Sequence, residues 1–307
     1  MGERDGAAGM DSAGTVRYRW PGGNRCAVVF SFDVDAESGY VFRHPEEAAT
    51  RLDEMEERRF GVRSGLSRIL RLLERYGLPA TFYVPGYTVE HHTAAVETIV
   101  RAGYELGCHG NVHEAVHLLD EAAERRILEE QLGIFRRYFG LRPTGYRSPA
   151  WSLNVRTPAL LKEFGFAYDS SLMGDDIPYF LNTPHGRLTE VPVQWLLDDA
   201  PFYRHVYGAT NAIAEPDRVI RLWKQEFRGI YREHGCFVLT MHPFISGRAS
   251  RIDGLERLIR AIRQDPGVWF ATAQQVADWA AETNQNTAVR VPLPGAAPPD
   301  SPRPPVP

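Results

Sequence analysis

An apolar run that ends in acids constrains the fold of this chain more than any other feature. Residues 25–37 read R-C-A-V-V-F-S-F-D-V-D-A-E, so large apolar side chains precede Asp33, Asp35 and Glu37. A continuous apolar run of this length is typical of a strand buried on both faces, as in parallel sheets. If the extended backbone continues, these acids point to one side, where their charges need a positive partner. The alternative for an isolated D-x-D is a polar strand end that faces water.

Short apolar segments alternate with segments of helical periodicity along the body of the chain. Further strands are expected at 80–84, 104–108, 146, 166–169, 188–193, 237–241 and 268–271. Helices are expected at 61–76, 93–102, 121–139, 157–164, 216–233, 254–263 and 273–281. Parallel strands crossed by helices form an open doubly wound sheet or a barrel, and no G-x-G-x-x-G follows the first strand to favour a dinucleotide fold. We therefore expect an α/β fold, a β/α barrel, with the site at the carboxyl ends of its strands.

The composition indicates one globular domain with polar ends. Of the 307 residues, 43% are hydrophobic and 24% charged, which is enough for a sizeable core. We expect a Gly-rich disordered arm at 1–22, a single domain at 23–283 and a Pro-rich disordered tail at 284–307. The net charge of −4 gives no reason to expect nucleic acid as a partner, and the lack of long apolar segments gives no reason to expect a membrane. Because no secretory signal is visible, we expect a cytoplasmic protein, with Cys26, Cys108 and Cys236 as buried thiols.

A second polar cluster, H-G-N-V-H, follows the strand expected at 104–108. His109 and His113 are four residues apart and would meet on one face of a helix, as they do in metal-binding helices. With Asp35 they make a two-histidine, one-carboxylate set, which suits Zn²⁺ with an open position for water, or Co²⁺ or Fe²⁺. Asp33 would then lie beside the site as a proton acceptor. The alternative is a pair of structural histidines, or, on ligands alone, an iron oxygenase.

Three further strand ends carry residues that suit chemistry. In R-S-P-A-W, Arg147 could clamp a buried carboxylate while Trp151 forms an apolar wall, although a surface arginine in a turn is an equal alternative. His242 follows the strand at 237–241 and is a candidate general acid, which Asp169 could orient. Trp151, Trp195 and Glu37 are the expected substrate contacts, and the alternative for the aromatic residues is an ordinary core position.

The motifs S-F-D-V-D, H-G-N-V-H, R-S-P-A-W, Y-D-S-S and L-T-M-H-P occur in this order. The set resembles the five motifs of the polysaccharide deacetylase family (NodB homology, carbohydrate esterase family four) and extends over about residues 25–280. The resemblance implies a distorted seven- to eight-stranded β/α barrel that removes an acyl group from nitrogen with the help of a metal. By this resemblance, Asp33 is the base, and Asp35, His109 and His113 bind the metal. Arg147 holds the base in place, and His242 is the acid, with Asp169 as its orienting partner.

One departure points to a particular branch of that family. The first motif is D-V-D-A-E, where the usual one has two adjacent aspartates followed by glycine. With H-P-F-I-S-G-R and V-P-V-Q-W-L-L-D-D-A-P it resembles the branch of Helicobacter-type peptidoglycan deacetylase, allantoinase and cyclic imide hydrolases. That resemblance implies a homo-oligomer, a tetramer, and substrates that include small cyclic amides.

The function expected from the sequence is hydrolysis of a non-peptide carbon–nitrogen bond. Its first form is N-deacetylation of an amino sugar or oligosaccharide, so the partner is a small amide or an N-acetylated sugar. The alternative is ring opening of a cyclic imide or ureide at the same site. A second alternative, a non-catalytic carbohydrate-binding module, is disfavoured because a binding site needs no paired base and acid.

Overall fold

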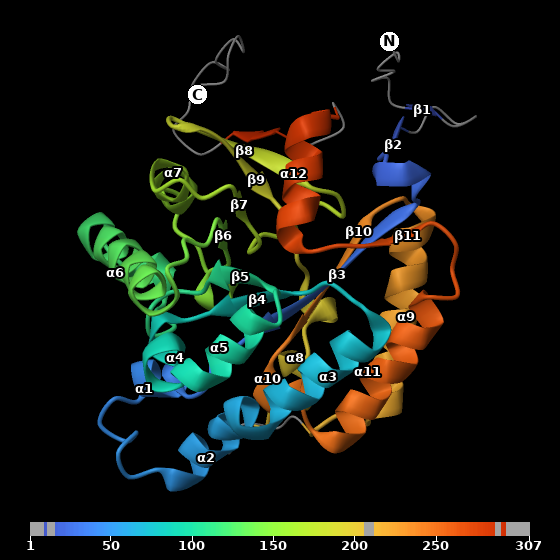
Figure 1. Ribbon diagram of the computed structural model, residues 1–307. Helices are drawn as coiled ribbons and strands as arrows, with labels where there is room; N and C mark the ends of the chain where they lie inside the picture. Colours follow the sequence, from blue (N-terminus) through green and yellow to red (C-terminus); the bar gives the residue numbers. More distant parts are fainter. Residues whose placement is uncertain (1–8, 11–15, 206–211, 286–289, 293–307) are drawn as a thin grey trace, which may run out of the picture.

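A twisted sheet of mostly parallel strands runs through the protein, with helices on its outer side (Figure 1). The computed structural model describes residues 9–10, 16–205, 212–285 and 290–292. The strands of this sheet are β3 (Cys26–Asp33), β4 (Thr81–Val84), β5 (Glu105–Cys108), β6 (Gly145–Tyr146), β7 (Tyr168–Asp169), β8 (Tyr179–Thr183), β9 (Gly186–Glu190), β10 (Cys236–Met241), β11 (Val268–Phe270) and β12 (Arg290–Pro292). A separate pair, β1 (Gly9–Met10) and β2 (Val16–Arg17), is antiparallel.

The strand order confirms the predicted α/β class. Neighbours follow the order β10-β3-β4-β5-β6-β7-β9-β8-β12, with β11 also paired to β3, and each of these pairs is parallel apart from β8–β9. An isolated parallel bridge between Asp198 and Thr240 joins the segment after β9 to β10. The two borders of the parallel run therefore meet at this point, at the carboxyl end of β10. Closure into a complete barrel stays a prediction.

Most of the helices cover the outer side of the sheet, whereas the last one packs on the opposite side. They are α1 (Ser38–Arg43), α2 (Leu52–Phe60), α3 (Leu66–Tyr76), α4 (Gly86–His91), α5 (Thr93–Arg101), α6 (Glu121–Phe139), α7 (Thr157–Glu163), α8 (Ala200–Tyr203), α9 (Pro216–Arg232), α10 (Pro243–Ser246), α11 (Ala249–Ile262) and α12 (Ala273–Thr283). A π-helical turn, Gly61–Gly65, joins α2 to α3. The bounds of α6 match the prediction, and the short helices α1, α4, α8 and α10 were not predicted from the sequence.

Two glycines of the π-helical turn allow α10 to pack closely against it. A side chain at Gly65 would begin 2.0 Å from the backbone oxygen of Pro243, and one at Gly61 would begin 2.8 Å from the backbone nitrogen of Phe244. Neither distance is possible for a real Cβ atom, so both positions require glycine for the close approach. This contact fixes the backbone directly after His242.

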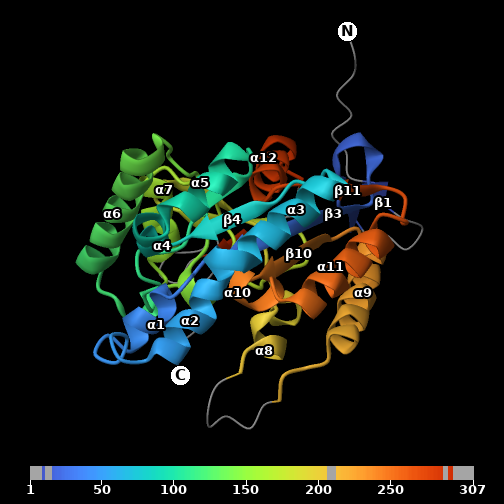
Figure 2. The same ribbon diagram turned by 60° about the horizontal axis from the view of Figure 1, so that its bottom comes forward.

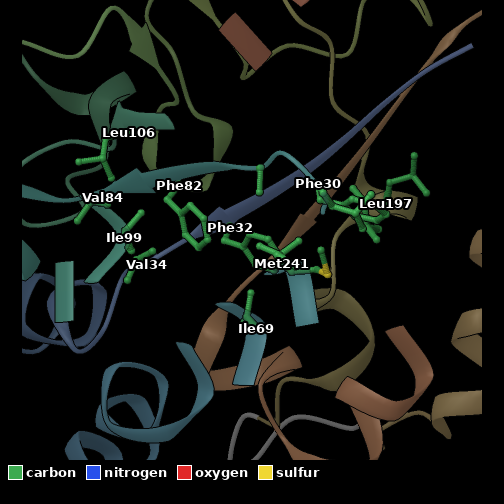
Figure 3. Close-up of a cluster of buried hydrophobic side chains, with 14 of the residues drawn as sticks. Phe30, Phe32, Val34, Ile69, Phe82, Val84, Ile99, Leu106, Leu197 and Met241 are labelled. Atoms are coloured by element: carbon green, nitrogen blue, oxygen red, sulfur yellow. The ribbon is translucent and has the colours of Figure 1, made fainter. Parts of the chain in front are cut away.

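The β3 strand is buried on both faces, as its apolar run predicts. Phe30, Phe32 and Met241 belong to the core between the sheet and the outer helices, where Phe32 stacks on Phe82 at 5.0 Å between ring centroids (Figure 3). Ala27 and Val29 face the opposite side and pack with a second buried cluster. Because side chains alternate along a strand, Asp33 points to this second, inner side of the sheet.

The packed body extends further toward the N-terminus than predicted. Tyr18 and Trp20 are buried, and the Trp20 Nε1 donates a hydrogen bond to the backbone oxygen of His234 at 2.8 Å. The disordered arm predicted at 1–22 is therefore wrong for these residues, because their aromatic rings cover the end of β11, where Trp20 lies 5.9 Å from Trp269. Residues 1–8 and 11–15 lie outside the described part of the chain.

The C-terminal segment also departs from the prediction where it is described. The Gln285 side chain donates to the backbone oxygen of Arg19 at 2.8 Å, and β12 pairs in parallel with β8. The disordered tail predicted at 284–307 is therefore wrong at these positions, and residues 286–289 and 293–307 lie outside the described ones.

Cys26, Cys108 and Cys236 are free and buried, as predicted. In the part of the chain that the structure describes, no helix has the length and hydropathy of a membrane span.

Candidate active site

The predicted site residues come together at the carboxyl ends of neighbouring parallel strands. Asp33 ends β3, while His109, Arg147 and His242 each directly follow β5, β6 and β10. A cavity of about 230 Å³ opens at this edge. Of the predicted residues, its lining includes Asp33, Asp35, His109, His113, Trp151, Trp195 and His242.

Asp35, His109 and His113 form a compact set of possible metal ligands. One ligand atom from each lies within 4.8 Å of the others, and Asp35 is 3.4 Å from His109 Nε2 and 3.6 Å from His113 Nε2. His109 Nδ1 lies 2.8 Å from the backbone oxygen of Arg147, so Nδ1 carries the proton and Nε2 has a free lone pair. Asp35 Oδ1 and His109 Nε2 are buried and have no hydrogen-bond partner in the part of the chain that the structure describes. Unpartnered ligand atoms in this arrangement fit a divalent metal such as Zn²⁺.

Charge and burial act in opposite directions on these ligands. Burial disfavours the ionised form of Asp35, but His113 and His109 outweigh it and hold its pKa below the usual range. Burial lowers the pKa of His113 to about 4, which keeps its imidazole neutral. For His109, the acids Asp33 and Asp35 outweigh burial and raise the pKa. The carboxylate is thus held ionised and His113 neutral, the forms that bind metal.

His113 reaches the site from a loop, so the predicted helical pair is wrong. The backbone of His113 has φ 62°, a left-handed conformation that interrupts a helix. Ala36, Ala150 and Trp151, which also line the cavity, have φ of 48°, 50° and 54°. Non-glycine residues rarely adopt such angles, and they cluster at functional sites, where surrounding structure holds them.

Arg147 holds Asp33 in place from behind the cavity. Its guanidinium is fully buried, donates to Asp33 Oδ1 and to Ser31 Oγ at 2.9 Å each, and lies 4.1 Å from the centre of the Tyr83 ring. Further bonds to the backbone oxygen and the hydroxyl of Ser170, both at 2.9 Å, fix its plane. Asp33 Oδ2 is 3.9 Å from His109 Nε2, so the second carboxylate oxygen faces the metal-ligand set. The geometry matches the predicted clamp on a buried carboxylate.

Asp199, and not the predicted Asp169, lies behind His242. His242 Nδ1 is 2.7 Å from Asp199 Oδ1, and the His242 backbone N–H and the Ser246 hydroxyl donate to Asp199 Oδ2 at 2.9 and 2.5 Å. Burial disfavours a charged imidazole, but Asp199 outweighs it and raises the pKa of His242 well above its usual value. The Nε2 atom of His242 lies 3.7 Å from Asp35 Oδ2, at the metal-ligand set.

Asp169 belongs to a different buried pair. Its Oδ1 accepts from the Ser171 hydroxyl at 2.7 Å, and the same hydroxyl accepts from the backbone N–H of Ser148 at 2.8 Å. Burial raises the pKa of Asp169 to about 6. Burial and the neighbouring charge of Asp169 together raise the pKa of Glu190 well above its usual value. This pair supports the loop that carries Arg147 and lies apart from His242, so the predicted orienting role of Asp169 is wrong.

Glu37 does not line the cavity, in contrast to the prediction. The left-handed turn at Ala36 ends the extended backbone, so Glu37 no longer points to the side of Asp33 and Asp35. Instead it accepts from Arg59 at 3.1 Å and pairs with His92 at 2.8 Å. Burial opposes ionisation of Glu37, but His92 and Arg59 outweigh it and lower its pKa.

Trp151 and Trp195 form one wall of the cavity. Their rings stack at 4.4 Å between centroids with 30° between planes. Trp151 is buried while Trp195 is 48% exposed, so the pair combines a fixed ring with an accessible one. The structure places both tryptophans where the sequence predicted substrate contacts, and that role stays a prediction.

Two groups that border the site were not among the predicted site residues. Asp198 lines the cavity with its side chain 3.8 Å from His242 Nδ1, and burial raises its pKa to about 7. Arg43, Arg58 and Arg204 also line the cavity. The available signal was the adjacent pair Asp198-Asp199 after an apolar run, whereas nothing in the pattern distinguished these arginines from surface residues.

Comparisons with known proteins agree with this geometry. Residues 53–168 match the sequence model described as polysaccharide deacetylase. The solved structure described as a "putative polysaccharide deacetylase" from Mycobacterium smegmatis is 37% identical to this chain with a TM-score of 0.86, and the match covers 95% of this chain and 99% of that one. The peptidoglycan deacetylase of Helicobacter pylori is 29% identical over 279 residues, 82% of this chain and 94% of that protein.

An allantoinase structure shares the fold, with 24% identity and a TM-score of 0.77 over 88% of this chain and 96% of that one. At this identity the likeness concerns the fold alone. The 37% identity over nearly the full length of the mycobacterial protein, by contrast, is enough to assign a family. This chain therefore belongs to the polysaccharide deacetylase family, and it is a hydrolase that acts on carbon–nitrogen bonds other than peptide bonds.

Proposed function

We propose that this protein is a metal-dependent N-deacetylase of a small N-acetylated amino sugar or short oligosaccharide. The observation that carries the proposal is the position of Asp33 and His242, a base and an acid, which both border the ligand set of Asp35, His109 and His113 in one cavity. Hydrolysis of an amide needs one group to accept the proton of water and another to protonate the leaving nitrogen. A binding module would need neither.

The residues fit a divalent metal, and we propose Zn²⁺. Asp35, His109 and His113 would hold it. Among the described residues, the buried Asp35 Oδ1 and His109 Nε2 have no hydrogen-bond partner, and the backbone oxygen of Arg147 fixes the His109 tautomer. When bound, such an ion polarises the acyl oxygen and lowers the pKa of a water molecule.

The side chains divide the proton transfers between them. Asp33 Oδ2 faces the ligand set and accepts the proton of the attacking water, while Arg147 orients the carboxylate through a hydrogen bond to Oδ1. His242 donates a proton from Nε2 to the leaving nitrogen, because Asp199 holds Nδ1–H and favours the protonated ring. The oxygen of Asp33 and the nitrogen of His242 thus serve successive steps of one hydrolysis.

The cavity favours a small substrate. Its volume of about 230 Å³ suits one sugar ring or a few rings that extend outward, and the stacked Trp151 and Trp195 provide an aromatic wall for the ring face. The same small volume also suits a cyclic imide or ureide, whose ring opening would use the same base and acid. That reaction is the second candidate function. Homo-oligomeric assembly and a cytoplasmic location also stay proposals.

The test compares metal content and hydrolysis in two variants with the wild-type protein. Asp33→Asn should lower kcat by roughly 100-fold or more with metal content unchanged, because the amide cannot accept the proton. His113→Ala should lose metal, measured by mass spectrometry of the protein solution. Acetate release from N-acetylglucosamine oligomers and ring opening of hydantoin and succinimide are followed in parallel.

Each result has a distinct consequence. Full activity in a verified metal-free preparation would refute metal dependence, and wild-type kcat in Asp33→Asn would refute its assignment as base. Ring opening without acetate release would replace the first candidate function by the second. Glu56→Gln, which changes an exposed surface carboxylate outside the cavity, is the control for both variants.

A further inference from the structure

Three arginines bring positive charge to the outer part of the cavity. Arg43 ends α1, Arg58 lies on α2, and Arg204 directly follows α8, and all three line the cavity. These helices lie on the same side of the molecule, around the carboxyl end of β3 (Figures 1 and 2). Segments distant in sequence thus deliver like charges to one small space.

Arg43 reaches the edge of the metal-ligand set. Its Nη2 atom and the ring of His113 each lie 3.3 Å from the point where a Cβ on Gly39 would stand. The guanidinium and the imidazole therefore meet over the same glycine. The pKa of Arg43 is lowered first by burial and then by the charge of Arg204. The pKa of Arg204 is lowered first by burial and then by the charge of Arg58. Arg43 therefore lies within range of the charge of Arg204, and Arg204 within range of the charge of Arg58.

Arg58 serves to fix this arrangement. Its guanidinium donates to Glu54 at 2.6 Å, lies 4.8 Å from the centre of the Tyr40 ring and is buried. Its charge is therefore largely balanced by Glu54. Arg43 is the more exposed group, it lies beside the ligand set, and its planar fork of N–H donors suits a carboxylate or phosphate.

The acids of the cavity are already committed to other groups. Asp33 is bonded to Arg147, and Asp35 faces His109 and His113. Asp198 accepts from the backbone N–H of Ala200 at 2.7 Å. The charge of Arg43 is thus directed at what enters the cavity.

We propose that the substrate carries an anionic group, a carboxylate, close to the amide that is hydrolysed, and that Arg43 binds this group. This rests on the proposed hydrolase function and narrows its substrate class. The net charge of the whole chain is −4, so overall attraction cannot supply this preference and the local guanidinium groups must.

The experiment compares acids with their neutral methyl esters. N-acetylmuramic acid, its methyl ester and N-acetylglucosamine share the same acetamido sugar, and only the first carries a carboxylate. For the ring-opening candidate, hydantoin-5-acetic acid and its methyl ester form the same pair. The wild-type protein should prefer each acid over its ester by about 10-fold or more in kcat/KM, as expected for a charged hydrogen bond that is partly open to water.

The variant Arg43→Gln should remove most of that preference, so that the ratio of kcat/KM for acid and ester falls toward one. The control is Arg126→Gln, which changes an exposed arginine of α6 outside the cavity lining and should leave the preference intact. Circular dichroism and thermal melts establish that both variants fold.

The outcomes separate this inference from the proposed function. Equal turnover of acid and ester by the wild-type protein would overturn the inference and leave the hydrolase function in place. If none of the compounds is hydrolysed, the proposed function fails for these substrates, and calorimetric binding to Asp33→Asn then decides. The inference is supported if Asp33→Asn binds the acid more tightly than the ester and if this difference disappears in the double variant Asp33→Asn/Arg43→Gln. Equal binding of acid and ester, or no binding of either, overturns it.

Discussion

Replacing Asp199 by asparagine tests the proposed acid more directly than any other change. The substitution keeps the size of the side chain but removes the charge that faces His242 Nδ1 at 2.7 Å. Asparagine has one acceptor oxygen, whereas Asp199 accepts from the ring of His242, from its backbone N–H and from Ser246. At least one of these three donors must therefore lose its partner.

The expected magnitude follows from the loss of one buried, charged hydrogen bond. Such a bond contributes about 2 kcal/mol, and 1.36 kcal/mol corresponds to one pH unit, so the pKa of His242 should fall by roughly 1.5. Asp199 raises this pKa, and removing its charge must lower it. Because the acid must be protonated to act, the basic limb of the profile of kcat/KM against pH should move to lower pH by about that amount.

Thermal stability gives an independent reading of the same pair. His242 has a folded pKa above its unfolded value, so the stability that Asp199 provides is fully present below the ordinary histidine pKa and is lost as pH rises through the folded value. The melting temperature of Asp199→Asn should therefore fall most in mildly acidic buffer and least at high pH. Differential scanning calorimetry over a series of pH values measures this.

The matched comparison is Asp169→Asn. This residue is bonded to Ser171 and lies beside Glu190, so its substitution should leave the basic limb in place, whatever it does to the melting temperature. A basic limb that moves in Asp169→Asn and stays in Asp199→Asn would refute the assignment and restore the partner expected from the sequence.

Three further predictions concern other parts of the structure. Trp20→Ala should lower the free energy of unfolding by about 3–5 kcal/mol in urea titrations, because this buried ring packs on the body, and an unchanged midpoint would return residue 20 to a disordered arm. Glu37→Gln should lower the free energy of unfolding by about 1–2 kcal/mol at neutral pH. This loss should shrink as pH falls, because a lowered pKa of Glu37 stabilises the fold at pH values above the ordinary glutamate pKa. An increased KM in a fully stable variant would instead support substrate contact. Trp195→Ala should raise KM by about 3- to 10-fold with kcat unchanged, and an unchanged KM for every substrate would remove this ring from the binding surface.

The sequence predicted the strand-end residues well, for a physical reason. Asp33, His109, Arg147 and His242 each follow or end a short apolar segment, and parallel strands place such ends at one edge of the sheet. The prediction needed only the apolar runs and their order. It did not need the register or the exact helix bounds.

The errors occurred where local backbone geometry or long-range contact decides the outcome. The positive φ of Ala36 and His113 turns Glu37 away from the site and replaces the predicted helix by a loop, and no periodicity reveals such an angle in a non-glycine residue. Asp199 reaches His242 only because Asp198 forms a bridge with Thr240, a contact between distant segments. Helices of four to six residues, such as α8 and α10, are too short to show a helical pattern.

Arg147 links the two halves of the site more closely than a simple clamp would. Its guanidinium holds Asp33, while its backbone oxygen accepts from His109 Nδ1 and so leaves Nε2 free as a ligand. One residue therefore orients both the proposed base and a proposed metal ligand, the first through its side chain and the second through its main chain. A substitution at this position would remove only the side-chain contact. For that reason Arg147→Met should impair the base while His109 keeps its tautomer and the metal content of the protein stays near normal.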